Sequence, residues 1–336
     1  MSDEFREGAS MNLRRNFLET IKWGKPERLC TDFGPLVMVR EPGSKVYDDE
    51  SRDVWGVKWG VGADETCKRP CVVPGYDVIT DINKWKEQII LPDIDGGKFD
   101  YEKAAAEAAK IDRKESIVCL NCTGGIFERA HFLLGFENCL VNLLLEPELM
   151  GELMDAIADV KIALIKKTYE ATRFEAIFYH DDWGSKHSLF FKPETWREII
   201  KPRHKRVVDA VKSLGDGNVI FIHHSDTYLE PLVPEMAELG IDVWQGCIPQ
   251  NDIVRLQKEL RGRIAFMGGI DIAKIDRKDF DEEEIRAEVR RAIDTYAPHG
   301  GFIPGIPSGS ALYDEVQRIY LDEVAKYAEK YSADNF

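Results

Sequence analysis

Two adjacent histidines and an aspartate follow a short apolar run near the middle of the chain. Val219–Ile222 is rich in β-branched residues, and His223, His224, Ser225 and Asp226 come directly after it. A neutral imidazole can act as a general acid or base near neutral pH, and it can also bind a metal. Parallel α/β folds place their chemistry at the carboxyl ends of buried strands. The alternative for either histidine alone is that it only hydrogen-bonds a loop.

A second polar cluster follows another apolar run, Glu175–Tyr179, and contains Asp181, Asp182 and Trp183. Adjacent side chains diverge, so we expect one aspartate to face a pocket while the other braces a loop. A carboxyl group that lies near another acid, or away from water, has a raised pKa and can donate a proton. The competing interpretation is a pair of solvated loop aspartates.

Two further clusters follow predicted strands. Glu128 lies beyond the strand Ser116–Leu120, where it could face the pocket or cap the next helix. Trp244, Gln245 and Cys247 end the strand that comes after the histidine cluster. Acids, imidazoles and aromatic rings gathered in one place suit a planar organic substrate that undergoes proton transfer or meets a metal.

A zinc site is one use for these side chains. Zinc in proteins takes three or four N, S or O ligands. We predict His223 and Cys247 as ligands, with one of Asp181 or Glu128 as a third. Spacing alone does not prove this set.

Strands and helices that could position these residues alternate from Ser116 to the C-terminus, which predicts parallel strands covered by helices. Length and repeat number favour a closed (β/α)8 TIM barrel over an open sheet. We expect one domain over residues 1–336, with a first strand at Arg28–Asp32 and an irregular excursion at about 35–75. The aromatic residues of Arg52–Trp59 could make this excursion a functional lid or a structural flap.

Composition excludes some classes of function. The formal charge of −15 argues against nucleic acid, because phosphate binding needs a basic surface. No stretch reaches 18 consecutive apolar residues, so we expect no transmembrane helix and no membrane partner. The seven cysteines are odd in number and scattered, which fits a reducing cytoplasm rather than a disulfide framework.

At these residues the sequence resembles the uroporphyrinogen decarboxylase superfamily, which includes cobalamin-dependent methyltransferases. The resemblance covers nearly the whole chain and implies the (β/α)8 barrel. The segments that carry it are Asp53–Trp59, Gly124–Gly135, Asp181–Gly184, Lys201–Arg206, Phe221–Asp226, Gly240–Val243, Gly268–Asp271 and Pro298–Gly301.

Two departures from the family pattern narrow the reaction. The decarboxylases hold porphyrinogen carboxylates with an Arg-Gln-Ala-Gly-Arg segment, whereas the matching region here reads Val37-Met-Val-Arg-Glu-Pro-Gly43. The methyltransferases that act on coenzyme M bind zinc through His-x-Cys and a later Cys. Those places read His223-His224-Ser225 and, approximately, Ser308 in this chain.

The resemblance therefore implies a substrate-side methyltransferase of the O-demethylase type. Such an enzyme moves a methyl group from a methoxylated, aromatic substrate to the cobalamin of a separate corrinoid protein. A bound zinc ion and a homodimer are both compatible with this resemblance. A decarboxylase-like lyase acting on a carboxylated substrate is the alternative, and a non-enzymatic corrinoid binder is a third. We expect the catalytic residues among His223, His224, Asp181 and Asp182, and substrate contacts from Glu128, Tyr179, Trp183, Trp244 and Gln245.

Overall fold

The computed structural model describes residues 12–31, 33–44, 47, 48, 50–61, 70–328 and 330. The chain divides into two compact units. Unit 1 comprises Met1–Val37, Asp112–Ile117 and Asp242–Phe336, and unit 2 comprises Met38–Ile111 and Val118–Ile241. The expectation of one domain over residues 1–336 stays a prediction.

Unit 2 is built on three parallel strands, β4 (Ile117–Cys122), β5 (Ala176–His180) and β6 (Ile220–His224). Their registers pair Cys119 with Ala176 and His180 with His224. All three strands are predicted from their apolar runs to within two residues. β6 nevertheless extends through both histidines, which sequence analysis placed after the strand.

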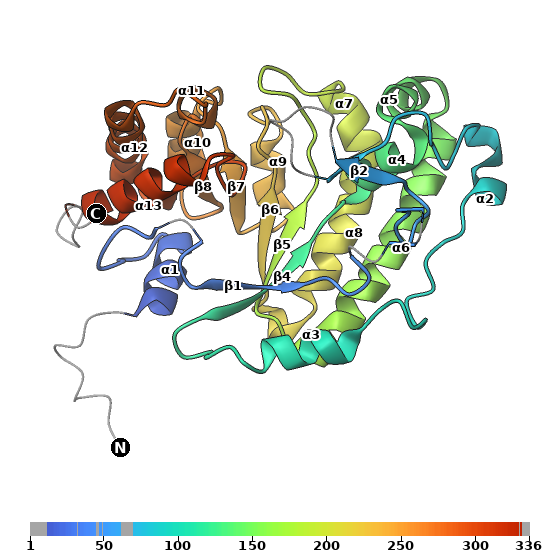
Figure 1. Cartoon of the computed structure of the whole chain (residues 1–336), viewed down its shortest axis with the longest axis horizontal. Coiled ribbons are helices and arrows are strands. Elements are labelled where there is room, and N and C mark those ends of the chain that lie inside the picture. The colour runs from blue at the N-terminus through green and yellow to red at the C-terminus, as the bar shows by residue number, and fades with distance from the viewer. Residues whose placement is uncertain are drawn as a thin grey trace. The chain divides into compact units, whose positions relative to one another are not determined.

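Helices cover these strands because each has an apolar stripe to bury. The longest, α6 (Pro147–Thr172), begins with proline in its first turn and buries Leu153, Ile157 and Ile165. It lies beside α8 (Lys201–Lys212), as Figure 1 shows. The other helices of unit 2 are η1 (Ile82–Lys84), α2 (Trp85–Gln88), α3 (Tyr101–Ala108), α4 (Ile126–Leu134), α5 (Phe136–Leu145), α7 (Pro193–Thr195), the π-helical η2 (Trp196–Ile200), η3 (Gly215–Gly217) and α9 (Val233–Glu238).

The predicted excursion contains more regular structure than expected. Strand β1 (Leu36–Arg40) lies at its start, and β2 (Trp59–Val61) pairs with β3 (Pro70–Val72) as an antiparallel ribbon. The strand predicted at Arg28–Asp32 is wrong, because only Arg28 makes a bridge there, and Asp32 lies outside the described residues. The apolar residues of that segment instead pack from a loop, with Leu29 and Cys30 buried.

Unit 1 contains a second set of parallel strands, β7 (Val243–Cys247), β8 (Ala265–Gly269) and β9 (Phe302–Gly305). The sequence predicts all three strands and most of the helices around them. The helices are α1 (Leu13–Ile21), α10 (Ile253–Glu259), α11 (Ile272–Ile275), α12 (Glu282–Tyr296), η4 (Ala297–His299) and α13 (Asp314–Ala328).

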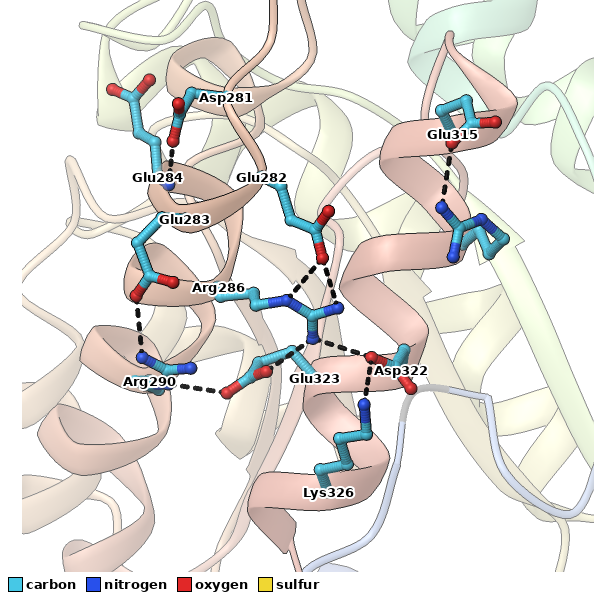
Figure 2. A network of polar contacts seen from close by, with 11 residues as sticks. Asp281, Glu282, Glu283, Glu284, Arg286, Arg290, Glu315, Asp322, Glu323 and Lys326 are labelled. Atoms are coloured by element: carbon cyan, nitrogen blue, oxygen red, sulfur yellow. Dashed lines mark hydrogen bonds and ion pairs between the residues drawn. The ribbon is translucent and has the colours of Figure 1, made fainter.

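An ion-pair network joins α12 to α13 (Figure 2). Arg286 Nη1 donates to Asp322 and to Glu323 at 2.7 Å each, and Arg290 Nε donates to Glu323 at 2.6 Å. The Glu323 side chain is only 6% exposed, so its buried negative charge needs the two arginines as partners. These ion pairs attach α13 to α12 within unit 1.

Within the part of the chain that the structure describes, no helix has the length and apolar character needed to cross a membrane.

Candidate active site

The two faces of β5 and β6 carry different kinds of side chain. Successive residues of a strand point to opposite faces, and the two strands are in parallel register. Tyr179 and His223 are register partners, and so are His180 and His224. Tyr179 and His223 therefore share one face of the two strands, and His180 and His224 share the other.

One face packs against α8 and is an aromatic core. The His223 ring lies 4.4 Å from that of Trp183 and 5.1 Å from that of His204, a residue of α8. Tyr179 packs on the same His204 ring, and all of these side chains are fully buried. Burial, reinforced by the neighbouring His204, holds the pKa of His223 well below its usual range, so the ring is neutral. His223, Tyr179 and Trp183 lie together, between strands and helix.

The opposite face carries a different cluster. The His224 ring lies 4.4 Å from that of His180 and 5.3 Å from that of Phe178. His180 Nε2 also lies 3.0 Å from the side-chain oxygen of Asn121 at the end of β4. Burial and the neighbouring His224 lower the pKa of His180 well below its usual value, so Nε2 of the neutral ring donates to Asn121.

Three side chains converge at the carboxyl ends of β5 and β6. Ligand atoms of Asp182, His224 and Asp226 all lie within 4.8 Å of one another. Oδ1 of Asp182 is buried and has no hydrogen-bond partner among the described residues. Burial raises the pKa of Asp182 to about 6, even though His224 opposes the shift. Between the two predicted aspartates, Asp182 is therefore the one that joins the histidine cluster.

Asp181 is the aspartate that holds the start of α4 in place. Its carboxylate accepts hydrogen bonds from the backbone N–H of Glu128 at 2.9 Å and of Phe127 at 3.3 Å, in the first turn of α4. Burial raises the pKa of Asp181 to about 7 against these two hydrogen bonds. Gly125 N donates to His180 O at 2.7 Å, and a Cβ at Gly125 would lie 2.5 Å from the Asp181 side chain. Only glycine allows this close approach.

Glu128 lies near both aspartates from the first turn of α4. Burial, followed by the charges of Asp182 and Asp181, raises its pKa well above the usual value. Sequence analysis offered Glu128 either as a helix cap or as a pocket residue. In the structure it lies in the first turn of α4 and also belongs to the acidic cluster. Burial beside two other acids favours the protonated form of this carboxyl group.

The donor set of Asp182, His224 and Asp226 fits a divalent metal. Two carboxylates and one imidazole are ligands that zinc and related ions accept, and Oδ1 of Asp182 is buried without a hydrogen-bond partner among the described residues. The ligands predicted from sequence, His223 and Cys247, belong to different units. Their joint binding of zinc stays a prediction.

The predicted residues of unit 1 are buried. Trp244 packs on Phe266, with ring centroids 6.2 Å apart, and Gln245 Nε2 donates to the carbonyls of Ile306 and Pro307. Burial raises the pKa of the Cys247 thiol, which favours the protonated form. Their predicted contacts with a substrate are untested.

The sequence did not predict Phe178 as a member of the site, whereas it placed Asn121, His180 and Asp226 at the strand ends without giving them individual roles. A signal was available, because residues two apart on a strand share a face and Phe178, His180 and Asp182 follow that spacing.

Residues 64–310 match the uroporphyrinogen decarboxylase (URO-D) family. The chain belongs to this family. Its α/β fold, with parallel strands covered by helices, is the TIM-barrel-like fold of the family, as the sequence predicted. Family membership does not by itself fix the reaction.

Individual URO-D relatives are distant. A uroporphyrinogen decarboxylase of Aromatoleum aromaticum is 24% identical over 190 residues, 55% of this chain and 50% of that protein. A uroporphyrinogen decarboxylase of Xanthomonas axonopodis pv. citri is 29% identical over 161 residues, 46% of this chain and 41% of that protein. The chain thus spans about half the length of the curated relatives it matches.

A solved structure shares the fold. A methyltransferase from Methanosarcina mazei superposes with a TM-score of 0.63 at 14% sequence identity, over 94% of this chain and 99% of that one. At this identity the likeness shows the architecture alone.

Proposed function

We propose that this URO-D family member is a methyltransferase. It transfers the methyl group of a methoxylated, aromatic compound to the cob(I)alamin of a separate corrinoid protein. The observation that carries this proposal is the convergence of Asp182, His224 and Asp226 beside Glu128, whose pKa is raised by burial and by the neighbouring acids. Such a site can activate an oxygen leaving group without supplying a nucleophile of its own.

An acidic site is sufficient for this reaction, because the partner protein supplies the nucleophile. Cobalt(I) of the partner is the nucleophile and takes the methyl carbon, while the C–O bond breaks and its electron pair stays on the oxygen. The oxygen leaves well only if it gains a proton or a Lewis acid. In this proposal Glu128 donates that proton, and its raised pKa keeps the proton available at neutral pH. The products are the methylated corrinoid and the free phenol.

Phe178 and His180 are the residues we assign to ring contact, since they share the face of His224. The substrate contacts predicted for Tyr179 and Trp183 have less support, because both side chains are fully buried on the face that packs against α8. Orienting the ring would align the methyl carbon with the incoming cobalt.

Asp182, His224 and Asp226 would hold a zinc ion in this proposal. When bound, zinc would supply a Lewis acid for the substrate oxygen. The neighbouring Ser225 supports the set, because its hydroxyl donates to Asp182 and orients that carboxylate.

Decarboxylation of a carboxylated substrate is the second candidate, and the names of the curated relatives favour it. Residues after β1 argue against a porphyrinogen. The hydroxyl of Ser44 donates to the carbonyl of Glu41. The Glu41 carboxylate is itself buried and paired with Lys161 at 3.0 Å, so this segment offers a polyanionic substrate little positive charge.

The deciding experiment is anaerobic methyl transfer to a corrinoid protein in its cob(I)alamin state, followed by visible spectroscopy. Aryl methyl ethers and methylamines are offered with untreated and with chelator-treated enzyme. Methylcobalamin formed from an aryl ether supports the proposal, and loss on chelation with recovery on zinc supports the metal. Release of CO₂ from a carboxylated substrate, with every methyl donor inactive, would establish the second candidate instead.

A further inference from the structure

A second site lies in unit 2, beside the segment that follows β1. It is a cavity of about 210 Å³, and none of Glu128, Asp182, His224 or Asp226 lines it. Its wall combines aromatic rings with two buried ion pairs. The residues used below are Tyr47, Trp55, Trp59, Phe99, Arg129 and Lys161, all of which line the cavity.

The two carboxylates of the wall have little acceptor capacity left. Asp53 accepts hydrogen bonds from Trp59 Nε1 at 3.0 Å, from Arg129 Nη1 at 2.8 Å and from the backbone N–H groups of Trp55 and Val57. Glu41 accepts from Lys161 Nζ at 3.0 and 3.3 Å through its two oxygens. Lys161 in turn donates to the carbonyl of Thr123 at 2.7 Å.

Arg129 is different, because it retains a donor. Its side chain is only 8% exposed, yet Nε has no hydrogen-bond partner among the described residues. The guanidinium lies 5.2 Å from the ring centroid of Trp55, and a Cβ at Gly124 would come within 2.9 Å of Nη2. A buried arginine donor without a partner is costly, and the cavity beside Arg129 has room for a ligand that supplies an acceptor.

The remaining wall is apolar and flat. Trp55, Trp59 and Phe99 line the cavity with aromatic rings, and Tyr47 adds an exposed phenol. An aromatic wall with an unpartnered arginine donor, and with both carboxylates already paired, favours a planar ring that carries a negatively charged acceptor group. The volume is sufficient for one ring.

We propose that this cavity is a binding site for a small aromatic carboxylate, with the carboxylate on Arg129 and the ring against Trp55 and Trp59. The cavity shares no residue with the acidic cluster, although Arg129 follows Glu128 in α4 and its charge lowers the pKa of Glu128. Binding to the cavity is therefore measured separately from methyl transfer. It gives the excursion after β1 a ligand, and so favours a functional over a purely structural role for that segment.

Isothermal titration calorimetry of the full chain tests this with benzoate, benzyl alcohol and benzylamine as probes. We expect saturable binding of benzoate at least tenfold tighter than that of the other two. Arg129→Lys, which keeps the charge but removes the Nε donor, should weaken benzoate tenfold or more. Val54→Trp should abolish benzoate binding, because Val54 is a half-buried turn residue that lines the cavity and the indole would fill it.

Arg203→Gln is the matched control, because Arg203 is a partly buried arginine of the same unit that pairs with Asp155 away from the cavity. It should bind benzoate as the unchanged protein does. If Arg129→Lys fails to fold, Val54→Trp decides alone. Absence of benzoate binding, equal affinity for the three probes, or unchanged binding in Val54→Trp would overturn the proposal, whatever the outcome of the methyl-transfer assay.

Discussion

His223 and His224 are adjacent in β6 yet lie on opposite faces of the strand. His223 contacts Trp183 and His204 of α8, whereas His224 contacts His180 and Phe178 and lies with Asp182 and Asp226. The two imidazoles therefore have different surroundings, and substitutions at the two positions should have separable effects.

Replacing each histidine by phenylalanine tests this separation. His224→Phe removes the nitrogen of the acidic cluster, and we expect methyl transfer to fall by about 10²-fold or more. His223→Phe retains a ring among Trp183 and His204, so activity should stay within about threefold. Urea unfolding of both variants shows whether each is folded. Equal losses of activity in two folded variants would refute the assignment of the faces.

Glu128→Gln tests the proton donor. Glutamine keeps the size and hydrogen bonding of Glu128 but cannot give up a proton, so kcat should fall by about 10²–10⁴-fold for an unactivated aryl ether. The loss should shrink for ethers whose phenol is more acidic, because that oxygen leaves without protonation. A loss that is the same across a series of ring-substituted ethers would assign Glu128 a structural role.

Asp181 should make stability depend on pH. Its folded pKa of about 7 lies above its usual value, so between about pH 4 and pH 7 the folded chain holds more protons than the unfolded chain. The contribution of this group is present below pH 4 and is lost as pH rises through 7, on the order of 4 kcal/mol.

Asp181→Asn removes that titration. The difference in unfolding free energy between the variant and the unchanged protein should therefore shift in favour of the variant between pH 5 and pH 7.5. Asp209→Asn, at an exposed aspartate of α8, serves as the control and should show no such shift. A constant difference across this range would contradict the raised pKa.

Gly125→Ala should destabilise the protein by about 2–3 kcal/mol, because the added Cβ would lie 2.5 Å from Asp181 and from the carbonyl of His180. Gly97→Ala is the control, since nothing lies within 4 Å of a Cβ there. Urea unfolding midpoints of the two variants give the comparison, and equal midpoints would mean that the loop around Asp181 adapts freely.

Glu323→Gln should weaken the attachment of α13 to α12, because two arginines lose their shared buried partner (Figure 2). We expect a loss of about 1–3 kcal/mol in unfolding free energy that shrinks in high salt. Glu315→Gln removes an exposed pair with Arg318 and should change stability by less than about 0.5 kcal/mol. Equal effects of the two variants would show that burial of Glu323 adds nothing.

The sequence predicts the strands well because each is a short apolar run followed by polar residues. The sequence could not predict which face of β6 each histidine occupies, because that depends on whether the strand continues through both of them. With β6 expected to stop at Ile222, both histidines belonged to a loop, whereas two more paired residues put them on opposite sides. The role of Asp181 was also out of reach, since its partners Phe127 and Glu128 are 54 and 53 residues away. Non-local partners of this kind leave no mark on local periodicity.

The pairing of Glu41 with Lys161 joins residues that are 120 positions apart. Synthesis at about 5–20 residues per second separates their emergence from the ribosome by roughly 6–24 seconds. During that interval the segment after β1 has no cation to neutralise Glu41 and no α6 to cover it. A nascent chain is therefore open to proteases and chaperones at this segment until α6 has been made, and translation speed through residues 42–161 sets how long that exposure lasts.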